Sequence, residues 1–380
     1  MVPFAAPLAA LSEIPDPRRP QGRRYPLAHL LLFSVLAVLA GATSYRGILT
    51  FVGVHRERLN ATFGVRLRRA PAVNTPRNLF LALDPADLEA AFRRHARGLH
   101  EAAPRPGPPV VALDGKTLRR SFDHLHDRAA AHVLSAFASE AALILAHREV
   151  PTAPDEVPAV PALVAELGLT CPACSSPPTR RTAKKRLRRR GRERQRPAGP
   201  GEGRPARPAR HPGRPLRRAG EREPFDRLGT VDRGRRGRQE HRRAEVFEVE
   251  GRLDRGWRPW VACAARVTRL TWRKDTRTGL WARGEEVALY ASQVGLDAAT
   301  FARAARAHRG IENRDHHVRD RILREDDSRI RRRPGIFARL RSFAPNILRA
   351  GGVGDVSEAV YVNALSLDRL LAYGLPGSQN

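Results

Sequence analysis

Two carboxylates stand in sequence settings that could support metal-ion chemistry. Asp114 follows the apolar run 110–113 in "PPVVALDGKTLRRSFD", and Glu312 lies in a helical stretch between His308 and His316. Because 308, 312 and 316 are four residues apart, these side chains are expected to share one helix face. Acids far apart in sequence can meet in the fold and bind Mg²⁺, which prefers oxygen ligands. Paired metal ions would then activate a water or a 3′-hydroxyl and stabilise the leaving oxygen.

Each of these residues also has a simpler interpretation. An acid at a strand end is more often a turn or cap residue, and a single glutamate is more often a surface residue of its helix. The cations that follow Asp114, namely Lys116, Arg119 and Arg120, could receive a phosphate backbone. On its own, this spacing is a weak signal for catalysis.

The pattern around these residues predicts an α/β chain. Residues 1 to about 100 read as packed helices, with Asn74 or Thr75 as one cap before Pro76, and Asp84 before Pro85 as another. A strand that ends at Asp114 and a hairpin of strands 132–138 and 141–150 follow, and then a short helix at 160–169. Later segments read as three strands ("RRAEVFEVEG", "RPWVACAARVTRLTWR", "GEEVALYAS"), a long helix ("AATFARAARAHRGIENRDHHVRDRILRED") and further helices, the first of them interrupted at Pro345.

The charge of the chain predicts a polyanionic partner. The net charge is +30 over 380 residues, and nucleic acid is the usual partner of such a protein. The cations are 65 Arg against four Lys, so GC-rich codons contribute to the bias. Residues 171–222 alone hold 18 Lys plus Arg and three acids, a net charge of +15.

The segment 171–222 differs from the rest of the chain in another way. It contains no Val, Ile, Met, Phe, Tyr or Trp, and Leu187 and Leu216 are its large aliphatic residues. Such a composition cannot bury enough surface to fold, so we expect a basic disordered segment. Cys171 and Cys174 lack a second ligand pair at zinc spacing, and three cysteines make no disulfide framework.

The apolar run 27–42 is the best candidate for a membrane span. It is short for that purpose and contains His29 and Ser34, so a buried helix is the better interpretation. The N-terminal sequence has no basic region before an apolar core, so we predict no signal peptide and a cytoplasmic, nucleoid-associated location.

Two motifs and the N-terminal region resemble one family. "ALDGKTLRRSFD" and "RAHRGIENRDHHVRDRILREDDSRIRR" are similar to motifs of the ISAs-type (ISAs-one) insertion-sequence transposases, and "IPDPRRPQGRRYPLAHLLLFSVLAVLAGATSYRGI" resembles their N-terminal associated domain. The resemblance covers nearly the whole chain except 171–222. It implies a ribonuclease-H-like α/β core with a β-rich insertion, preceded by a helical domain and interrupted here by the basic segment. It also implies metal-dependent DNA cleavage and transfer, with two Asp and one Glu as ligands of Mg²⁺ or Mn²⁺.

The resemblance assigns roles to individual residues. Asp114 matches the first acid and Glu312 the last, as catalytic residues and metal ligands. Its remaining matches at these motifs are Lys116, Arg119, His308, Asn313 and His316, which we expect to contact DNA, and Asp320, Glu325 and Asp326. Arg309 and His317 depart from the family, which usually has Trp at both positions.

The middle acid of the family is missing. No Asp occurs between Asp155 and Asp226, where the strand that carries it should lie. Read from the third base of the Thr170 codon, "TCPACSSPPTRRTAKKR" permits LPGLLFTPDAAHCQKK, which resembles the family's strand with the missing Asp. Read from the second base of each codon, "AGPGEGRPA" permits LVQVKGDQ, which resembles the next strand. The segment therefore reads as out-of-frame translation with at least three frame changes.

These observations predict an insertion-sequence DDE transposase that is catalytically defective. The expected domains are 1–103 (helical, transposase-associated), 108–170 (first part of the core), 171–223 (basic segment) and 224–380 (β-rich insertion and C-terminal helices). The expected partners are the terminal inverted repeats of the element and target DNA. The chain could also form a homodimer, and no membrane is expected as a partner. The alternatives are a non-catalytic DNA-binding protein derived from a transposase, and a globular protein with a functional basic linker.

Overall fold

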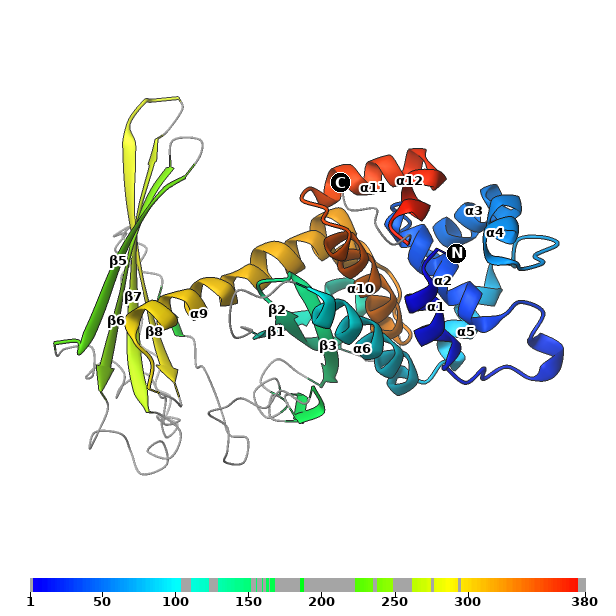
Figure 1. The fold of residues 1–380 in the computed structure, drawn as a ribbon, viewed down its shortest axis with the longest axis horizontal. Coiled ribbons are helices and arrows are strands. Elements are labelled where there is room, and N and C mark those ends of the chain that lie inside the picture. Colours follow the sequence, from blue (N-terminus) through cyan, green and yellow to red (C-terminus); the bar gives the residue numbers. More distant parts are fainter. Residues whose placement is uncertain are drawn as a thin grey trace, which may run out of the picture. The chain divides into compact units, whose positions relative to one another are not determined.

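The computed structural model describes most of the chain outside the basic segment (Figure 1). The described residues are 3–103, 111–122, 129–151, 155, 159, 162–163, 165–167, 185–187, 223–234, 238–248, 262–274, 277–292 and 295–374. At 185–187, 232–234, 238, 289, 291–292 and 307–313 the description is of the backbone. Of the predicted basic segment 171–223, the structure describes 185–187 and 223. Of the predicted helix 160–169, it describes 162–163 and 165–167, and four of these five residues are helical.

The chain divides into two compact units. One comprises Met1–Leu169 with Ala307–Asn380, and the other Thr170–Arg306. The helices and short helical turns of the first unit are α1 (Ala5–Ser12), η1 (Pro20–Gly22), α2 (Leu27–Leu39), α3 (Tyr45–Val54), α4 (Arg56–Phe63), α5 (Asn74–Ala82), α6 (Pro85–Ala102), η2 (Arg119–Ser121), the π-helices η6 (Ile311–His316) and η7 (Val318–Ile322), η8 (Glu325–Asp327), α10 (Pro334–Ala350), α11 (Val356–Leu365) and α12 (Leu367–Ala372). The N-terminal helices and the start of the predicted core therefore share one unit.

The apolar run near the N-terminus forms the buried helix α2. Eleven of its 13 residues are buried, and it packs against α1, α3 and α10. This confirms the prediction of a buried helix, because a helix that is apolar on all sides needs protein around its whole surface. Within the part of the chain that the structure describes, no helix has both the length and the apolar character to cross a bilayer.

The two predicted N-terminal caps have different outcomes. Asp84 caps α6, since its Oδ1 accepts a hydrogen bond from the Ala86 N–H at 2.8 Å and Pro85 takes the first helical position. The prediction for α5 is wrong: the helix begins at Asn74, and the preceding Val73 makes no side-chain cap. Val73 already has helical backbone angles, so Asn74 lies inside the helix.

The first sheet is an antiparallel meander of strands β1 (Val111–Thr117), β2 (His132–Ala138) and β3 (Leu143–Val150). The hairpin at 139–142 confirms the predicted pair of strands, with a turn that begins at the predicted Ser139 and extends to Ala142. A bulge in β3 shifts the register between Ala136 and Phe137. Helices α6 and α10 both pack against β3.

Helix α10 continues through Pro345, so the predicted interruption is wrong. The helix is buried along most of its length, and the residue after the proline ties it to the bulge of β3. Asn346 Oδ1 accepts from the Ile144 N–H at 2.8 Å, and its Nδ2 donates to the Ile144 carbonyl at 2.8 Å. Tertiary contacts therefore outweigh the loss of one helical hydrogen bond at the proline.

The substitution Asn346→Leu is expected to lower the free energy of unfolding by about 2–4 kcal/mol. It would leave the Ile144 N–H and carbonyl buried without partners, and each such group costs about 1–3 kcal/mol. Asn363→Leu is the graded control, because Asn363 makes one buried bond, from Nδ2 to the Leu39 carbonyl at 3.1 Å. Urea denaturation of both variants would test the account, which fails if the two losses are equal.

The second unit contains a five-stranded antiparallel sheet in the order β4-β8-β7-β6-β5. Its strands are β4 (Lys185–Leu187), β5 (Asp226–Gly234), β6 (Arg238–Glu248), β7 (Cys263–Lys274) and β8 (Trp281–Ser292). The predictions for β6, β7 and β8 are confirmed. β5 was missed because "DRLGTVDRG" has no apolar alternation, and β4 is a short strand within the segment expected to be disordered. Helix α9 (Ala298–Gly310) follows, and the division between the two units falls within it.

Candidate active site

The strand β1 carries Asp114 in its interior. The prediction that the strand ends at this acid is wrong, since β1 runs to Thr117 and Asp114 pairs with Ser135 of β2. The side chain of Asp114 is half-buried, and its Oδ1 accepts a hydrogen bond from the Gly115 N–H at 3.0 Å. The strand thus fixes the acid on a rigid element, as metal chemistry would require.

Lys116 explains why the strand can continue past the acid into a cationic sequence. Its side chain is buried and lies on the same face as Asp114, two residues away. The Lys116 Nζ pairs with Asp320, with Glu325 Oε2 at 2.6 Å and with Asp326 Oδ1 at 3.8 Å. This geometry gives Lys116 a structural role and no support for the predicted phosphate contact. Arg119 differs, because 78% of its side chain is exposed.

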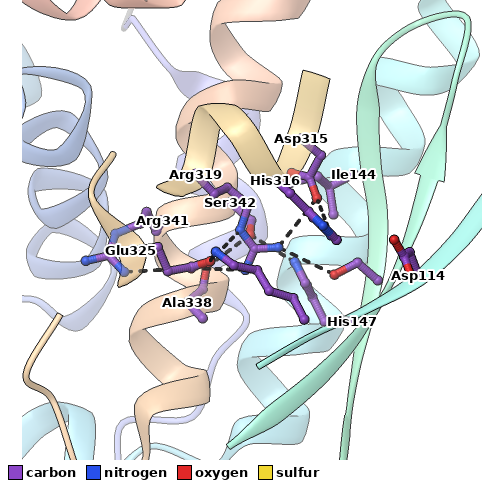
Figure 2. A network of polar contacts seen from close by, with 12 residues as sticks. Asp114, Ile144, His147, Asp315, His316, Arg319, Glu325, Ala338, Arg341 and Ser342 are labelled. Atoms are coloured by element: carbon purple, nitrogen blue, oxygen red, sulfur yellow. Dashed lines mark hydrogen bonds and ion pairs between the residues drawn. The ribbon is translucent and has the colours of Figure 1, made fainter. Parts of the chain in front are cut away.

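Glu325 is the centre of a buried ionic cluster (Figure 2). Arg319 holds both of its oxygens, with Nη2 at 3.0 Å from Oε1 and Nε at 2.9 Å from Oε2, and Arg341 Nη1 lies 3.7 Å from Oε1. We call this group the Glu325 cluster: Lys116, Asp315, Arg319, Asp320, Glu325, Asp326 and Arg341.

The Glu325 cluster connects η7 and η8 to β1. Burial alone would raise the pKa of Glu325, but the attraction of Arg319, Lys116 and Arg341 holds it well below its usual range. Since charges in a low-dielectric interior depend on their partners, the cluster fixes the helical segment after Glu312 against the strand that carries Asp114.

Asp315 and His316 lie at the edge of this cluster that faces Asp114 (Figure 2). Asp315 is buried, 3.6 Å from Arg319 Nη1 and 3.8 Å from His316 Nε2, and neither of its oxygens has a hydrogen-bond partner among the described residues. Burial raises the pKa of Asp315. Burial also lowers the pKa of His316, while the nearby charge of Asp114 acts in the opposite direction. A neutral imidazole and two acids thus lie close together.

The predicted residues His308, Glu312 and Asn313 are placed by their backbone. His308 lies in α9, and Glu312 and Asn313 lie in η6, which packs against β1. Their side chains lie outside the described part of the structure. The long helix was predicted, but not its π-helical winding from Ile311 to Ile322, which is frequent at functional sites.

The described residues do not complete a metal site. No group of three His, Cys, Asp or Glu side chains in the described ranges is arranged to hold an ion. Asp320, Glu325 and Asp326 each lie within 4 Å of Lys116, so an ion at those acids would have to displace a cation. The assignment of Asp114 and Glu312 as metal ligands stays a prediction from the sequence, since the side chain of Glu312 lies outside the described part of the structure.

Sequence reasoning missed a second buried network, centred on Glu89 of α6. Glu89 accepts from the His147 N–H of β3 at 2.7 Å, and its Oε2 pairs with Arg339 Nε of α10 at 2.8 Å. The His147 Nε2 lies 2.9 Å from Ser342 Oγ. In the sequence, Glu89 could be noticed as an acid on the apolar face of a helix. That position does not indicate its partners on β3 and α10.

The Glu89 network predicts loss of stability in acid. Burial alone would raise the pKa of Glu89, but its interactions with His147 and Arg339 lower it to about 2 from a usual 4.5. A depressed carboxyl pKa stabilises the fold above pH 4.5, and this contribution is lost as the pH falls toward 2. The free energy of unfolding would fall by about 3 kcal/mol, because each unit of pKa shift corresponds to about 1.36 kcal/mol. Urea unfolding at several pH values should show a shallower acid dependence in Glu89→Gln than in the parent, and identical slopes would contradict the assignment.

Similarity to known proteins supports one family. Residues 8–96 match the family described as DDE_Tnp_1-associated. The chain is 26% identical over 373 residues to "Putative protein YbfL" of Escherichia coli K12, with 97% of each chain covered. It is also 26% identical to the "H repeat-associated putative transposase YhhI" of the same strain, with 97% of each covered, and to the "Putative transposase YncI" of E. coli O157:H7, with 95% of this chain and 93% of that protein covered.

The matched regions include the elements that carry the candidate site. The associated domain corresponds to helices α1–α6, and the near full-length alignments include both the strand that carries Asp114 and the helical segment that carries Glu312. Residues 8–96 therefore carry a DDE_Tnp_1-associated domain, and the near full-length similarity to putative transposases supports a DDE transposase family for this chain.

Proposed function

We propose that this chain is an insertion-sequence transposase and that it is catalytically defective. The observation that carries the proposal is the pairing of two facts. The Glu325 cluster holds the segment after Glu312 against the strand of Asp114. No Asp occurs between Asp155 and Asp226 to supply a third acid. The chain thus has two acids of the expected triad and a supported scaffold for them.

The fold proposed for the core is ribonuclease-H-like. The antiparallel order β1-β2-β3, with α6 and α10 against β3, supports the first half of such a core. The five-stranded sheet β4–β8 supports a β-rich insertion between the strand and the last acid. The remaining core strands would come from the sequence at 171–222, which in its present reading has almost no large apolar residue.

The reaction proposed for the family member with an intact core is cleavage at the ends of the element and joining to target DNA. A bound Mg²⁺ or Mn²⁺ would supply activation of the attacking oxygen and charge stabilisation of the leaving one. Asp114 and Glu312 would hold the ion, and His316, which is neutral and close to Asp114, would help to orient that carboxylate. Arg119 is exposed beside this position and is the better candidate of the two predicted nearby cations for a DNA phosphate.

A non-catalytic DNA-binding protein is the second candidate function. The net charge of +30 favours it, because the cations remain even where the third acid is missing. Incubation of the purified chain with a labelled element end and Mg²⁺ or Mn²⁺ tests both candidates. We expect binding without strand cleavage, and metal-dependent cleavage by this chain would overturn the proposed defect.

A further inference from the structure

Helix α9 packs against one face of the sheet β4–β8. On the other face, Phe247 and Ala264 are buried, and the residues toward the β7–β8 turn are more exposed. On the covered face, Ala265, Val267 and Tyr290 pack with Phe301 of α9. The Tyr290 and Phe301 rings meet edge to face at 5.3 Å between centroids. Because successive residues of a strand point to opposite faces, the even-numbered residues of β7 lie on the other side.

On the face opposite to α9, tryptophans and cations alternate where β7 and β8 approach their turn. Lys274 pairs with Trp281 and Trp272 pairs with Arg283 in the register of the two strands. All four side chains lie on one face, with the tryptophans on one diagonal and the cations on the other. His241 of β6 contacts Trp272 edge to face at 4.8 Å, which holds that ring in place.

The turn of this hairpin exposes apolar surface. Leu280 is 71% exposed and Trp281 is 48% exposed. Gly279, next to Leu280, has φ of +71°, a conformation that other residues adopt only with strain. Large apolar side chains that gather at an exposed tip among cations mark an interaction site more often than a packing defect.

We propose that this surface, which comprises Trp272, Lys274, Leu280, Trp281 and Arg283, binds single-stranded DNA. The proposal rests on the proposed function as a DNA transposase and extends it to a surface outside the Asp114 site. Proteins that bind single strands combine cations along the backbone with aromatic rings on which bases stack. The alternating pattern provides both within one small area. Its two cations are complementary to phosphate, and Arg283 Nη2 also lies 3.7 Å from Glu285 Oε2 on the same face. A duplex offers no unstacked base face to the exposed indole, which is why a single strand is the favoured occupant.

The proposal is tested by fluorescence anisotropy of the full chain with a labelled 30-nucleotide single-stranded DNA. Trp281→Ala is expected to weaken binding about 5- to 100-fold, the range for the loss of one stacked base. Trp281→Phe should restore most of the affinity. Lys274→Ala with Arg283→Ala should reduce the slope of log K against log salt by about 1.4, at about 0.7 for each phosphate contact.

Matched controls remove the same chemistry elsewhere. Tyr361→Ala removes an exposed aromatic ring, and Arg303→Ala with Arg306→Ala removes two exposed cations of α9. Both controls should keep the affinity within about 2-fold of the parent. The arginine pair should also change the salt slope less than Lys274→Ala with Arg283→Ala does. Circular dichroism of every variant excludes loss of folding, which is not expected for exposed side chains at a turn.

Three outcomes would overturn the proposal. They are an unchanged affinity in Trp281→Ala, a stronger effect of that change on duplex DNA, and tighter binding of RNA of the same sequence. Glu140→Gln, on the exposed turn between β2 and β3, should bind the single strand as the parent does. The proposed surface shares no residue with the Asp114 site, so a failed cleavage assay leaves this test intact, and a failure of this test leaves the assignment of Asp114 and Glu312 untouched.

Discussion

A chain in which 170–223 is rewritten to the shifted reading is expected to cleave element-end DNA with Mg²⁺ or Mn²⁺, whereas the present chain does not. The rewritten segment contains LLFTPDAAHCQ and so restores both an Asp and an apolar strand in place of 18 cations. A third carboxylate would complete the ligand set begun by Asp114 and Glu312, and hard divalent ions need such oxygen donors. Cleavage of a labelled terminal repeat on a denaturing gel measures the effect.

Variants of the rewritten chain separate catalysis from folding. Asp114→Asn and Glu312→Gln should each lower the cleavage rate more than about 100-fold, because even groups that merely contact a metal ligand are worth 10- to 100-fold. Glu140→Gln, on the exposed turn between β2 and β3, is the matched control and should cleave at the parental rate. Full activity of Asp114→Asn would show that this acid is not a metal ligand.

Loss of the carboxylate at the centre of the Glu325 cluster is expected to have the largest effect on stability. Glu325→Gln would leave Lys116, Arg319 and Arg341 buried beside one another with too little negative charge. Breaking a buried ionic group by removal of one partner costs about 3–5 kcal/mol. The free energy of unfolding in urea should fall by that amount, with the rest of the chain unchanged.

Asp327→Asn is the control for Glu325→Gln. Asp327 lies in the same short helix, η8, but its pair with Arg324 at 2.9 Å is largely exposed. Exposed pairs contribute little, so the control should lose less than about 1 kcal/mol. A loss below 1 kcal/mol in Glu325→Gln would mean that water reaches the cluster and that it does not fix η7 against β1.

The elements with clear periodicity were predictable from the sequence. The apolar run of α2, the cap at Asp84 and the apolar, β-branched strands β2 and β7 each carry a local signal that packing does not reverse. The errors lie where tertiary contacts outweigh local preference. Pro345 should interrupt a helix, but Asn346 ties α10 to the bulge of β3 and the helix continues.

The candidate site was predictable in part, for a related reason. The acids Asp114 and Glu312 could be named from their motifs, but the partners of Lys116 could not. Its ammonium meets Glu325 across more than two hundred residues of sequence, and no local pattern encodes that contact. A lone lysine after an expected strand end suggests a DNA contact, whereas in the fold Lys116 lies within β1 and pairs with three acids.

The nucleotide sequence of codons 165 to 230, read in all three frames, tests the central claim most directly. The account predicts that the frame that starts at the third base of codon 170 spells LLFTPDAAHCQ, and that a second shifted frame spells LVQVKGDQ further on. If corrected bases put LLFTPDAAHCQ in frame with the rest of the gene, the defect was a sequencing error and the protein is an active transposase. If the present frame stands and the shifted frames spell these strands, the copy is decayed. Shifted frames that spell neither strand would contradict the account and leave the basic segment to be explained by a function of its own.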